Sequence, residues 1–277
     1  MDDPMISAAR LSRRLHDFDI IDATYYMPAD PARARADFQA LRIPGARLFE
    51  IDEIVDRSSD LPHMLPDAGT FARAAAELGI DGSRPVAVYD RSVNHFSAPR
   101  VWLTLKLFGI ENCYVLDGGF SAWMNAGCPV VSGDAGDRTV APRTWTLDKG
   151  RVLTGAEMAK AVAAGDGTIF DARSKERFAG AAAEPRPGLR SGHMQGASCV
   201  PFTSLTRSDG LFVDPSTLRT MFGYPTDREP IVSCGSGLTA CVLALGLARL
   251  GLNARLYDGS WSEWGRGALG DIITDAV

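Results

Sequence analysis

The sequence predicts an α/β protein built from two tandem domains that are related by duplication, each a parallel sheet flanked by helices. Two observations support this prediction. Three segments of the first half recur in the same order in the second half, and in both halves short apolar segments alternate with helical ones. With 277 residues, the chain is long enough for two domains that each bury a core.

The recurring segments keep their order, while the loops between them differ in length. They are a strand that ends in Asp-Ala, a turn that contains Gly-Ala, and an Asp-Gly turn followed by a tryptophan. Their positions are residues 18–24 and 167–173, 43–47 and 193–198, and 117–123 and 258–264. A spacing of roughly 150 residues indicates a duplicated domain rather than a solenoid of short repeats.

Each half contains three predicted strands and one predicted helix that ends at a glycine. In the first half the strands are residues 20–22, 86–90 and 114–116, and the helix 101–108 precedes Gly109. In the second half the strands are residues 169–171, 231–234 and 255–257, and the helix 238–250 precedes Gly251. Alternating strands and helices predict a parallel sheet covered on both faces, with ligands at the carboxyl ends of the strands.

The domain boundaries follow from composition. The segment from Gly127 to Gly150 is rich in Gly, Pro and Asp, as linkers are. We therefore predict an N-terminal domain at residues 1–132, a linker at 133–150 and a C-terminal catalytic domain at 151–277.

Charge and composition exclude several classes of function. The net charge is −5 and no basic run occurs, which argues against nucleic-acid or acidic-membrane binding. No apolar run approaches the roughly 20 residues of a membrane span, and the acidic N-terminus lacks the pattern of a signal peptide. The four histidines are scattered and no Cys-x-x-Cys occurs, so we expect neither a metal nor a cofactor. An odd number of cysteines without framework spacing favours a reducing, cytoplasmic location.

One cysteine lies in a context that favours a nucleophile. Residues 231–240 read Ile-Val-Ser-Cys-Gly-Ser-Gly-Leu-Thr-Ala, so Cys234 follows a strand and opens a glycine-flanked loop before a helix. A free cysteine is only roughly 3% ionised at pH 7, and a ring of backbone N–H groups favours the thiolate. The matching position of the first half is Asp90, so one half keeps the chemistry. The other cysteines are predicted to be unreactive packing residues: Cys113, Cys128, Cys199 and Cys241.

These residues resemble the tandem rhodanese-domain sulfurtransferases, the family of rhodanese and 3-mercaptopyruvate sulfurtransferase. The resemblance covers nearly the whole chain and includes residues 97–102, 117–120, 184–188 and 257–261. In that family a Cys-Arg-Lys-Gly-Val-Thr-Ala loop goes with thiosulfate and Cys-Gly-Ser-Gly-Val-Thr-Ala with 3-mercaptopyruvate. The loop that begins at Cys234 is of the second kind, with Leu238 in place of valine.

The resemblance also implies substrate-binding residues. Two arginines nine residues apart, Arg177 and Arg186, match residues that hold the donor's carboxylate, which guanidinium groups bind well. Ordinary surface cations are the alternative interpretation of both. The remaining loop residues are expected to line the donor site: Gly235, Gly237, Leu238 and Thr239.

A carboxylate–imidazole–hydroxyl set is implied as well. Asp52 and His63 of the first half match residues proposed to act with the loop serine, here Ser236, and such a set would place the site between the domains. The alternatives are that His63 is structural in a proline-rich loop and that Asp52 caps a helix beginning at Glu53.

The implied reaction moves sulfur from 3-mercaptopyruvate to a Cys234 persulfide and then to cyanide, a thiol or thioredoxin. The protein is expected to be a monomer. Thiosulfate:cyanide sulfurtransferase activity is the nearest alternative. A Cys-loop phosphatase would need an arginine to close the loop, where Ala240 stands, and a non-catalytic rhodanese-like binding protein would not need Cys234.

Overall fold

The computed structural model describes residues 3–165, 168–223 and 228–275, which form two compact units. The first unit contains the chain up to Arg57 together with Leu65–Asp148 and Thr206–Phe212. The second contains Ser58–Met64, Lys149–Leu205 and the described chain from Val213 onward. Each unit therefore includes a short segment from the opposite half of the sequence, and His63 belongs to the second unit.

The first unit has a five-stranded parallel sheet with the strand order β1-β5-β4-β2-β3. The strands are β1 (Met5–Ile6), β2 (Asp19–Asp22), β3 (Ala46–Leu48), β4 (Val86–Tyr89) and β5 (Cys113–Leu116). The helices are α1 (Ala8–Ser12), α2 (Pro31–Ala40), α3 (Ala68–Glu77), α4 (Ser97–Leu107) and α5 (Gly119–Asn125).

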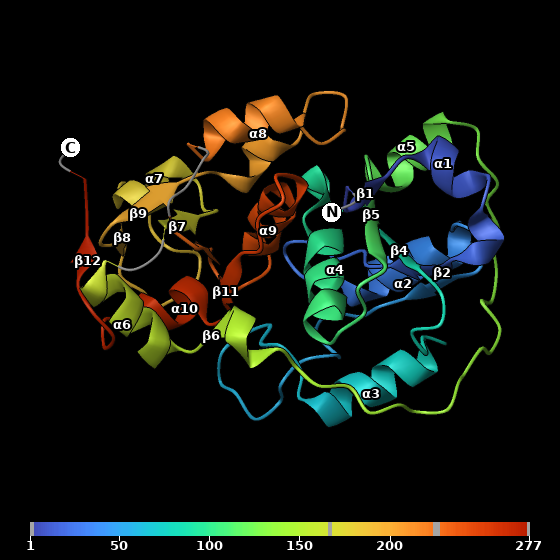
Figure 1. Ribbon diagram of the computed structural model, residues 1–277, viewed down its shortest axis with the longest axis horizontal. Coiled ribbons are helices and arrows are strands. Elements are labelled where there is room, and N and C mark those ends of the chain that lie inside the picture. The colour runs from blue at the N-terminus through green and yellow to red at the C-terminus, as the bar shows by residue number, and fades with distance from the viewer. Residues whose placement is uncertain (1–2, 166–167, 224–227, 276–277) are drawn as a thin grey trace. The chain divides into compact units, whose positions relative to one another are not determined.

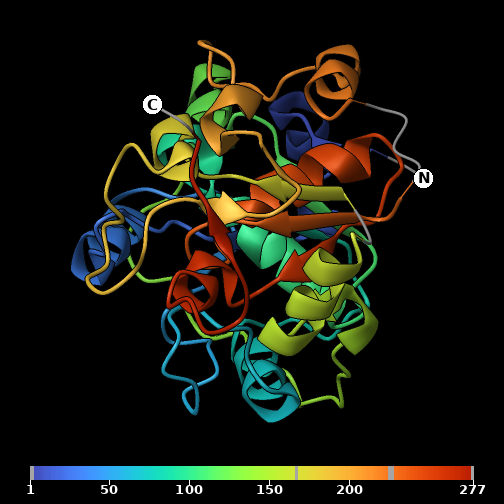
Figure 2. The same ribbon diagram turned by 90° about the vertical axis from the view of Figure 1, so that its left-hand side faces the viewer.

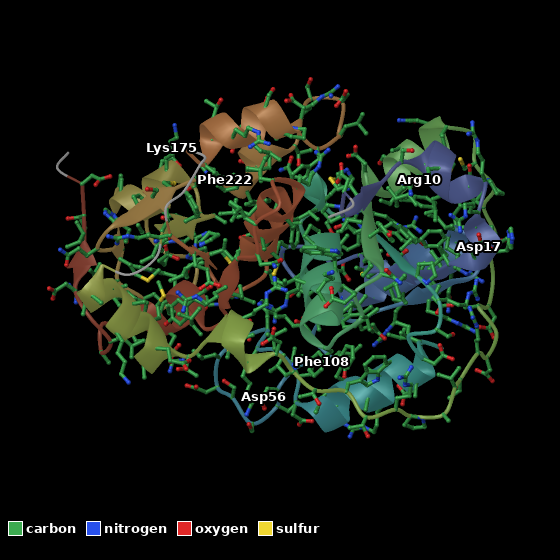
Figure 3. The ribbon with its side chains drawn as sticks, in the orientation of Figure 1. Arg10, Asp17, Asp56, Phe108, Lys175 and Phe222 are labelled. Atoms are coloured by element: carbon green, nitrogen blue, oxygen red, sulfur yellow. The ribbon has the colours of Figure 1, made fainter. Side chains whose placement is uncertain are left out.

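Helices cover this sheet in two layers. Residues of α1, α2 and α5 share one hydrophobic cluster with Ile20 and Tyr89. The α3–α4 layer is joined by Phe71 stacked on Phe108, with ring centroids 3.9 Å apart. Figure 1 shows α4 and α5 on opposite sides of β5, and Phe108 is labelled in Figure 3. Adjacent strand residues point to opposite faces, so both layers bury apolar side chains.

The segment that follows α5 is bound to the first unit by arginines. Arg42 donates to the carbonyl of Asp134 at 2.7 Å, and Arg138 forms an ion pair with the buried Asp19 at 2.9 Å. Most of the predicted linker, up to Asp148, therefore belongs to the first unit and contacts it.

The second unit repeats the same sheet. Its parallel strands have the order β6-β11-β10-β7-β9, which matches the first unit position by position and confirms the predicted duplicated α/β fold. They are β6 (Val152–Leu153), β7 (Thr168–Asp171), β9 (Ala197–Cys199), β10 (Pro230–Ser233) and β11 (Arg255–Tyr257). A separate antiparallel pair joins β8 (His193–Met194) to β12 (Ile272–Ile273).

Two helix layers enclose this sheet as well. The helices are α6 (Gly155–Ala164), α7 (Lys175–Ala179), α8 (Pro215–Met221), α9 (Ala240–Arg249) and α10 (Ser260–Trp264). Met158 of α6 and Trp261 of α10 share a cluster with Ile231. On the other face, Phe170 contacts Phe222 edge-on at 5.0 Å. Figure 2 shows α6 and α8 on opposite sides of the strands, and Phe222 is labelled in Figure 3.

The structure adjusts the predicted boundaries. The helix predicted to begin at residue 101 begins at Ser97, because the N–H groups of Ser97 and Ala98 donate to the Asp90 carboxylate at 2.9 and 2.8 Å. Pro99 fits this first turn because its missing N–H would have no helical partner there. In the second unit, β10 ends at Ser233 and α9 begins at Ala240, so the loop from Cys234 is longer than predicted. None of the described helices has the length and hydropathy of a bilayer span.

Candidate active site

Cys234 is the first residue after β10, at the carboxyl edge of the second sheet, and it is buried. Its N–H donates to the Ser260 hydroxyl at 3.1 Å, and its carbonyl accepts from the Trp261 N–H at 3.0 Å. The first two residues of α10 therefore bind both the N–H and the carbonyl of Cys234. Gly237, with φ of 78°, lets the loop turn into α9 through a left-handed conformation that favours glycine.

Both predicted arginines lie beside the residue that follows the cysteine. A Cβ atom added to Gly235 would lie 3.2 Å from Nη2 of Arg177 and 4.0 Å from Nη1 of Arg186. The glycine thus leaves room for two guanidinium groups next to Cys234. Their shared position at the loop favours the binding role over that of ordinary surface cations.

Arg177 is held by a buried carboxylate that the sequence interpretation missed. It lies on α7, whose first residue, Lys175, is labelled in Figure 3. Its Nε donates to Oε1 of Glu184 at 3.1 Å and its Nη2 donates to Oε2. Glu184 stands two residues before Arg186, inside the 184–188 segment that carries the family resemblance, and that position was the available signal.

Arg173, which the sequence also did not point to, binds the other side of Glu184. Its Nη1 donates to Oε1 of Glu184 at 2.9 Å, and its Nε and Nη2 contact both carboxylate oxygens of Asp171. The guanidinium also lies 3.9 Å above the ring of Trp261. Burial opposes the charge, but the ion pairs with Asp171 and Glu184 outweigh it and raise the pKa of Arg173 above its ordinary value.

Ser236 is contacted from two sides. Nδ1 of His63 lies 3.0 Å from its Oγ, and Nη2 of Arg186 donates to the same oxygen at 3.3 Å. His63 has a φ of 60°, which is uncommon outside glycine. Its segment is also held to the second unit by an ion pair between Asp60 and Arg266 at 2.8 Å. Two members of the predicted set therefore meet.

Asp52, the third predicted member, is an exposed residue of the first unit. It lines a pocket there with Tyr25, Tyr26 and Glu50 among others. Its approach to His63 and Ser236 stays a prediction. Residues 51–53 form a turn, so the alternative that Asp52 caps a helix beginning at Glu53 is wrong.

The other cysteines lie in settings that suit packing. Cys113 and Cys241 are buried, and Cys128 and Cys199 are half-buried. Burial raises the pKa of Cys199 to about 11 and raises the pKa of Cys113 further. A thiol with such a pKa is not ionised at neutral pH. Within the described residues, no group of three or more His, Cys, Asp or Glu side chains is arranged to hold a metal ion.

In the first unit, Asp90 occupies the position that corresponds to Cys234, directly after the central strand β4. The carbonyl of Asp90 accepts from the Phe120 N–H at 2.9 Å, just as that of Cys234 accepts from Trp261. The Asp90 carboxylate accepts from the N–H groups of Ser97 and Ala98. The first unit thus presents a carboxylate directly after its central strand, at the position where the second unit presents the sulfur of Cys234.

Comparison with known proteins agrees with this geometry. Residues 7–126 and 154–266 each match the family described as "Rhodanese-like domain". The 3-mercaptopyruvate sulfurtransferase of Escherichia coli (strain K12) is 40% identical over 266 residues, which cover 94% of this chain and 93% of that protein. "Thiosulfate/3-mercaptopyruvate sulfurtransferase 1, mitochondrial" of Arabidopsis thaliana is 38% identical over 298 residues, covering 95% of this chain and 76% of that protein. The crystal structure of SseA from Escherichia coli, described as a 3-mercaptopyruvate sulfotransferase, superposes with a TM-score of 0.82 at 37% identity, covering 94% and 99% of the two chains.

Proposed function

The chain belongs to the Rhodanese-like family as a two-domain sulfurtransferase, and on that premise we propose that it takes sulfur from 3-mercaptopyruvate through Cys234. The observation that carries this proposal is the position of Arg177 and Arg186 beside Gly235, next to the only cysteine placed at the end of a central strand of the described sheets. A donor carboxylate bound there would bring its sulfur to the nucleophile.

The first half-reaction forms a persulfide. The Cys234 thiolate attacks the mercapto sulfur, a sulfur–sulfur bond forms, and the carbon–sulfur bond of the donor breaks. The electron pair of that bond leaves on carbon as the pyruvate enolate, which takes a proton to give pyruvate. The Ser236 hydroxyl, supported by His63 and Arg186, is the group that stabilises the enolate oxygen.

The second half-reaction passes the outer sulfur to a nucleophile and restores the thiolate. The backbone N–H groups of the loop from Gly235 to Ala240 stabilise the anionic sulfur in both states. We propose a thiol such as thioredoxin as the acceptor, with cyanide as a laboratory substitute. We also propose that the protein is a monomer and acts in the cytoplasm.

Thiosulfate is the second candidate donor, because the Arabidopsis relative carries both donors in its name. Thiosulfate is a compact dianion, and the loop lacks the Arg-Lys pair that would face it, since Gly235 and Ser236 stand at those positions. We therefore propose 3-mercaptopyruvate as the preferred donor. Ala240 stands where a Cys-loop phosphatase needs an arginine, and the presence of Cys234 disfavours a binding protein without catalysis.

The test is the mass of the intact protein after incubation with 3-mercaptopyruvate. Transfer of one sulfur adds about 32 Da by the covalent route, and cyanide then removes it. The Cys234→Ser variant should gain nothing, while Cys199→Ser should gain the same mass as the natural protein. The proposal fails if the natural protein gains no mass or if Cys234→Ser gains it equally.

A further inference from the structure

Glu184 is a buried carboxylate that forms ion pairs with two arginines, Arg173 and Arg177, next to the proposed donor site. The exposed fraction of its side chain is 2%, against 1% for Arg173 and 24% for Arg177. Oε1 accepts from both arginines, at 2.9 Å from Arg173 and 3.1 Å from Arg177. The carboxylate thus links a buried cation to a cation that reaches the surface of the site.

This link determines which edge of Arg177 faces the loop. A guanidinium has five N–H donors in one plane. Glu184 takes the edge formed by Nε and Nη2, and the edge formed by Nη1 and Nη2 remains for a ligand. Nη2, which belongs to this remaining edge as well, lies 3.2 Å from the Cβ position of Gly235, so the guanidinium that Glu184 holds lies beside the loop. Glu184 itself cannot turn easily, because Arg173 is clamped between Asp171 and the ring of Trp261.

Glu184 also determines the charge of the cluster. Arg177 and Arg186 approach Gly235, and ion pairs link Arg177 through Glu184 to Arg173 and Asp171. This cluster has five charged side chains, three of them positive and two negative. Their sum is one positive charge, and the Cys234 thiolate of the proposed reaction brings the total to zero. A neutral residue at position 184 would make either total more positive by one charge, which favours a dianion such as thiosulfate over a donor with one carboxylate.

We propose that Glu184 is a positioning residue that aims Arg177 at the donor carboxylate and favours donors with a single negative charge. This inference rests on the proposed function, since it assigns donor binding to Arg177. It concerns a residue that touches neither the donor nor the reacting sulfur.

The experiment compares three variants of the full-length protein. Glu184→Gln removes the charge and keeps the shape, while Glu184→Asp keeps the charge and withdraws the carboxylate by one methylene. Glu176→Gln is the matched control, because Glu176 is an exposed glutamate of α7, the helix that carries Arg177, and lies outside the cluster. The measurements are kcat and KM with 3-mercaptopyruvate and with thiosulfate, and the Kd of pyruvate by calorimetry.

We expect Glu184→Gln to raise the KM for 3-mercaptopyruvate and the Kd of pyruvate about tenfold, as the loss of an aligned charged hydrogen bond does. The ratio of kcat/KM for 3-mercaptopyruvate to that for thiosulfate should fall at least about fivefold. Glu184→Asp should raise the same KM and Kd but leave the ratio unchanged. The rate at which cyanide discharges a preformed persulfide should stay the same in every variant.

A purely structural role would lower the activity with both donors equally, so an unchanged ratio in Glu184→Gln overturns the inference. Unchanged pyruvate binding in Glu184→Asp overturns it as well, even if Glu184→Gln does not fold. Failure of the proposed function looks different: the natural protein would gain no sulfur from 3-mercaptopyruvate, whatever the variants do to pyruvate binding.

Discussion

Nδ1 of His63 lies 3.0 Å from Oγ of Ser236, although the two residues are 173 positions apart in the chain. Ser58–Met64 belongs to the same unit as Ser236, and His63 adopts a left-handed backbone conformation within this segment. Backbone strain of this kind persists where the surrounding structure enforces it and is frequent at functional sites. The imidazole and the hydroxyl are therefore expected to act together.

A double-mutant cycle tests that coupling. Ser236→Ala should lower the single-turnover rate of persulfide formation about 10²-fold, the lower end of general acid–base effects. His63→Asn keeps a residue that tolerates the left-handed conformation and should lower the rate similarly. The double variant should lose little more than either single variant, since both remove the same interaction. Strictly additive losses would show that the two residues act separately.

The arginines should affect donor binding more than turnover. A lysine provides a point charge without the two-pronged geometry, so Arg177→Lys and Arg186→Lys should each raise the KM for 3-mercaptopyruvate by roughly 10- to 100-fold. The control is Arg10→Lys at an exposed arginine of α1, labelled in Figure 3, which should leave KM unchanged. Steady-state kinetics provide the measurement. A loss confined to kcat would contradict the binding role.

Replacing the two loop glycines by alanine should change different quantities, the KM at Gly235 and the free energy of unfolding at Gly237. At Gly235 the new methyl group would lie 3.2 Å from Nη2 of Arg177, so Gly235→Ala should raise KM several-fold by displacing that guanidinium. At Gly237 the φ of 78° is unfavourable for alanine, and Gly237→Ala should lower the free energy of unfolding by about 1–2 kcal/mol. Urea unfolding and KM values, measured on both variants, separate the effects. Equal stability of the two variants would contradict this assignment.

The buried ion pair below the site should contribute strongly to stability. Arg173→Gln leaves Asp171 buried without its cation, and breaking a buried pair in this way costs about 3–5 kcal/mol of unfolding free energy. Arg207→Gln is the matched control, because it removes an ion pair with Asp209 whose partners are both about half exposed, and such pairs contribute about 0–1 kcal/mol. Urea denaturation provides both values. A similar loss in the two variants would show that Arg173 is not held as described.

The sequence predicts those helices and strands whose own residues show an apolar pattern or a glycine that ends them. The strand at residues 255–257 matches β11 in both bounds, and the glycine after each central helix ends it as predicted. The strands β1 and β6, with two residues each, were not predicted, because so short a segment shows no periodicity. They exist because each pairs with a neighbouring strand that lies far away in sequence.

Repeats, alternating apolar segments and glycine positions are all visible in consecutive residues, so the duplication, the parallel sheets and the loop that presents Cys234 could be predicted without a structure. The position of Glu184 between Arg173 and Arg177, and that of His63 in the unit of Ser236, could not be predicted in this way, because both depend on how the chain folds. A carboxylate next to a proline has many accessible partners in an unfolded chain. Which partner it keeps depends on burial, where an unpaired charge is too costly to persist.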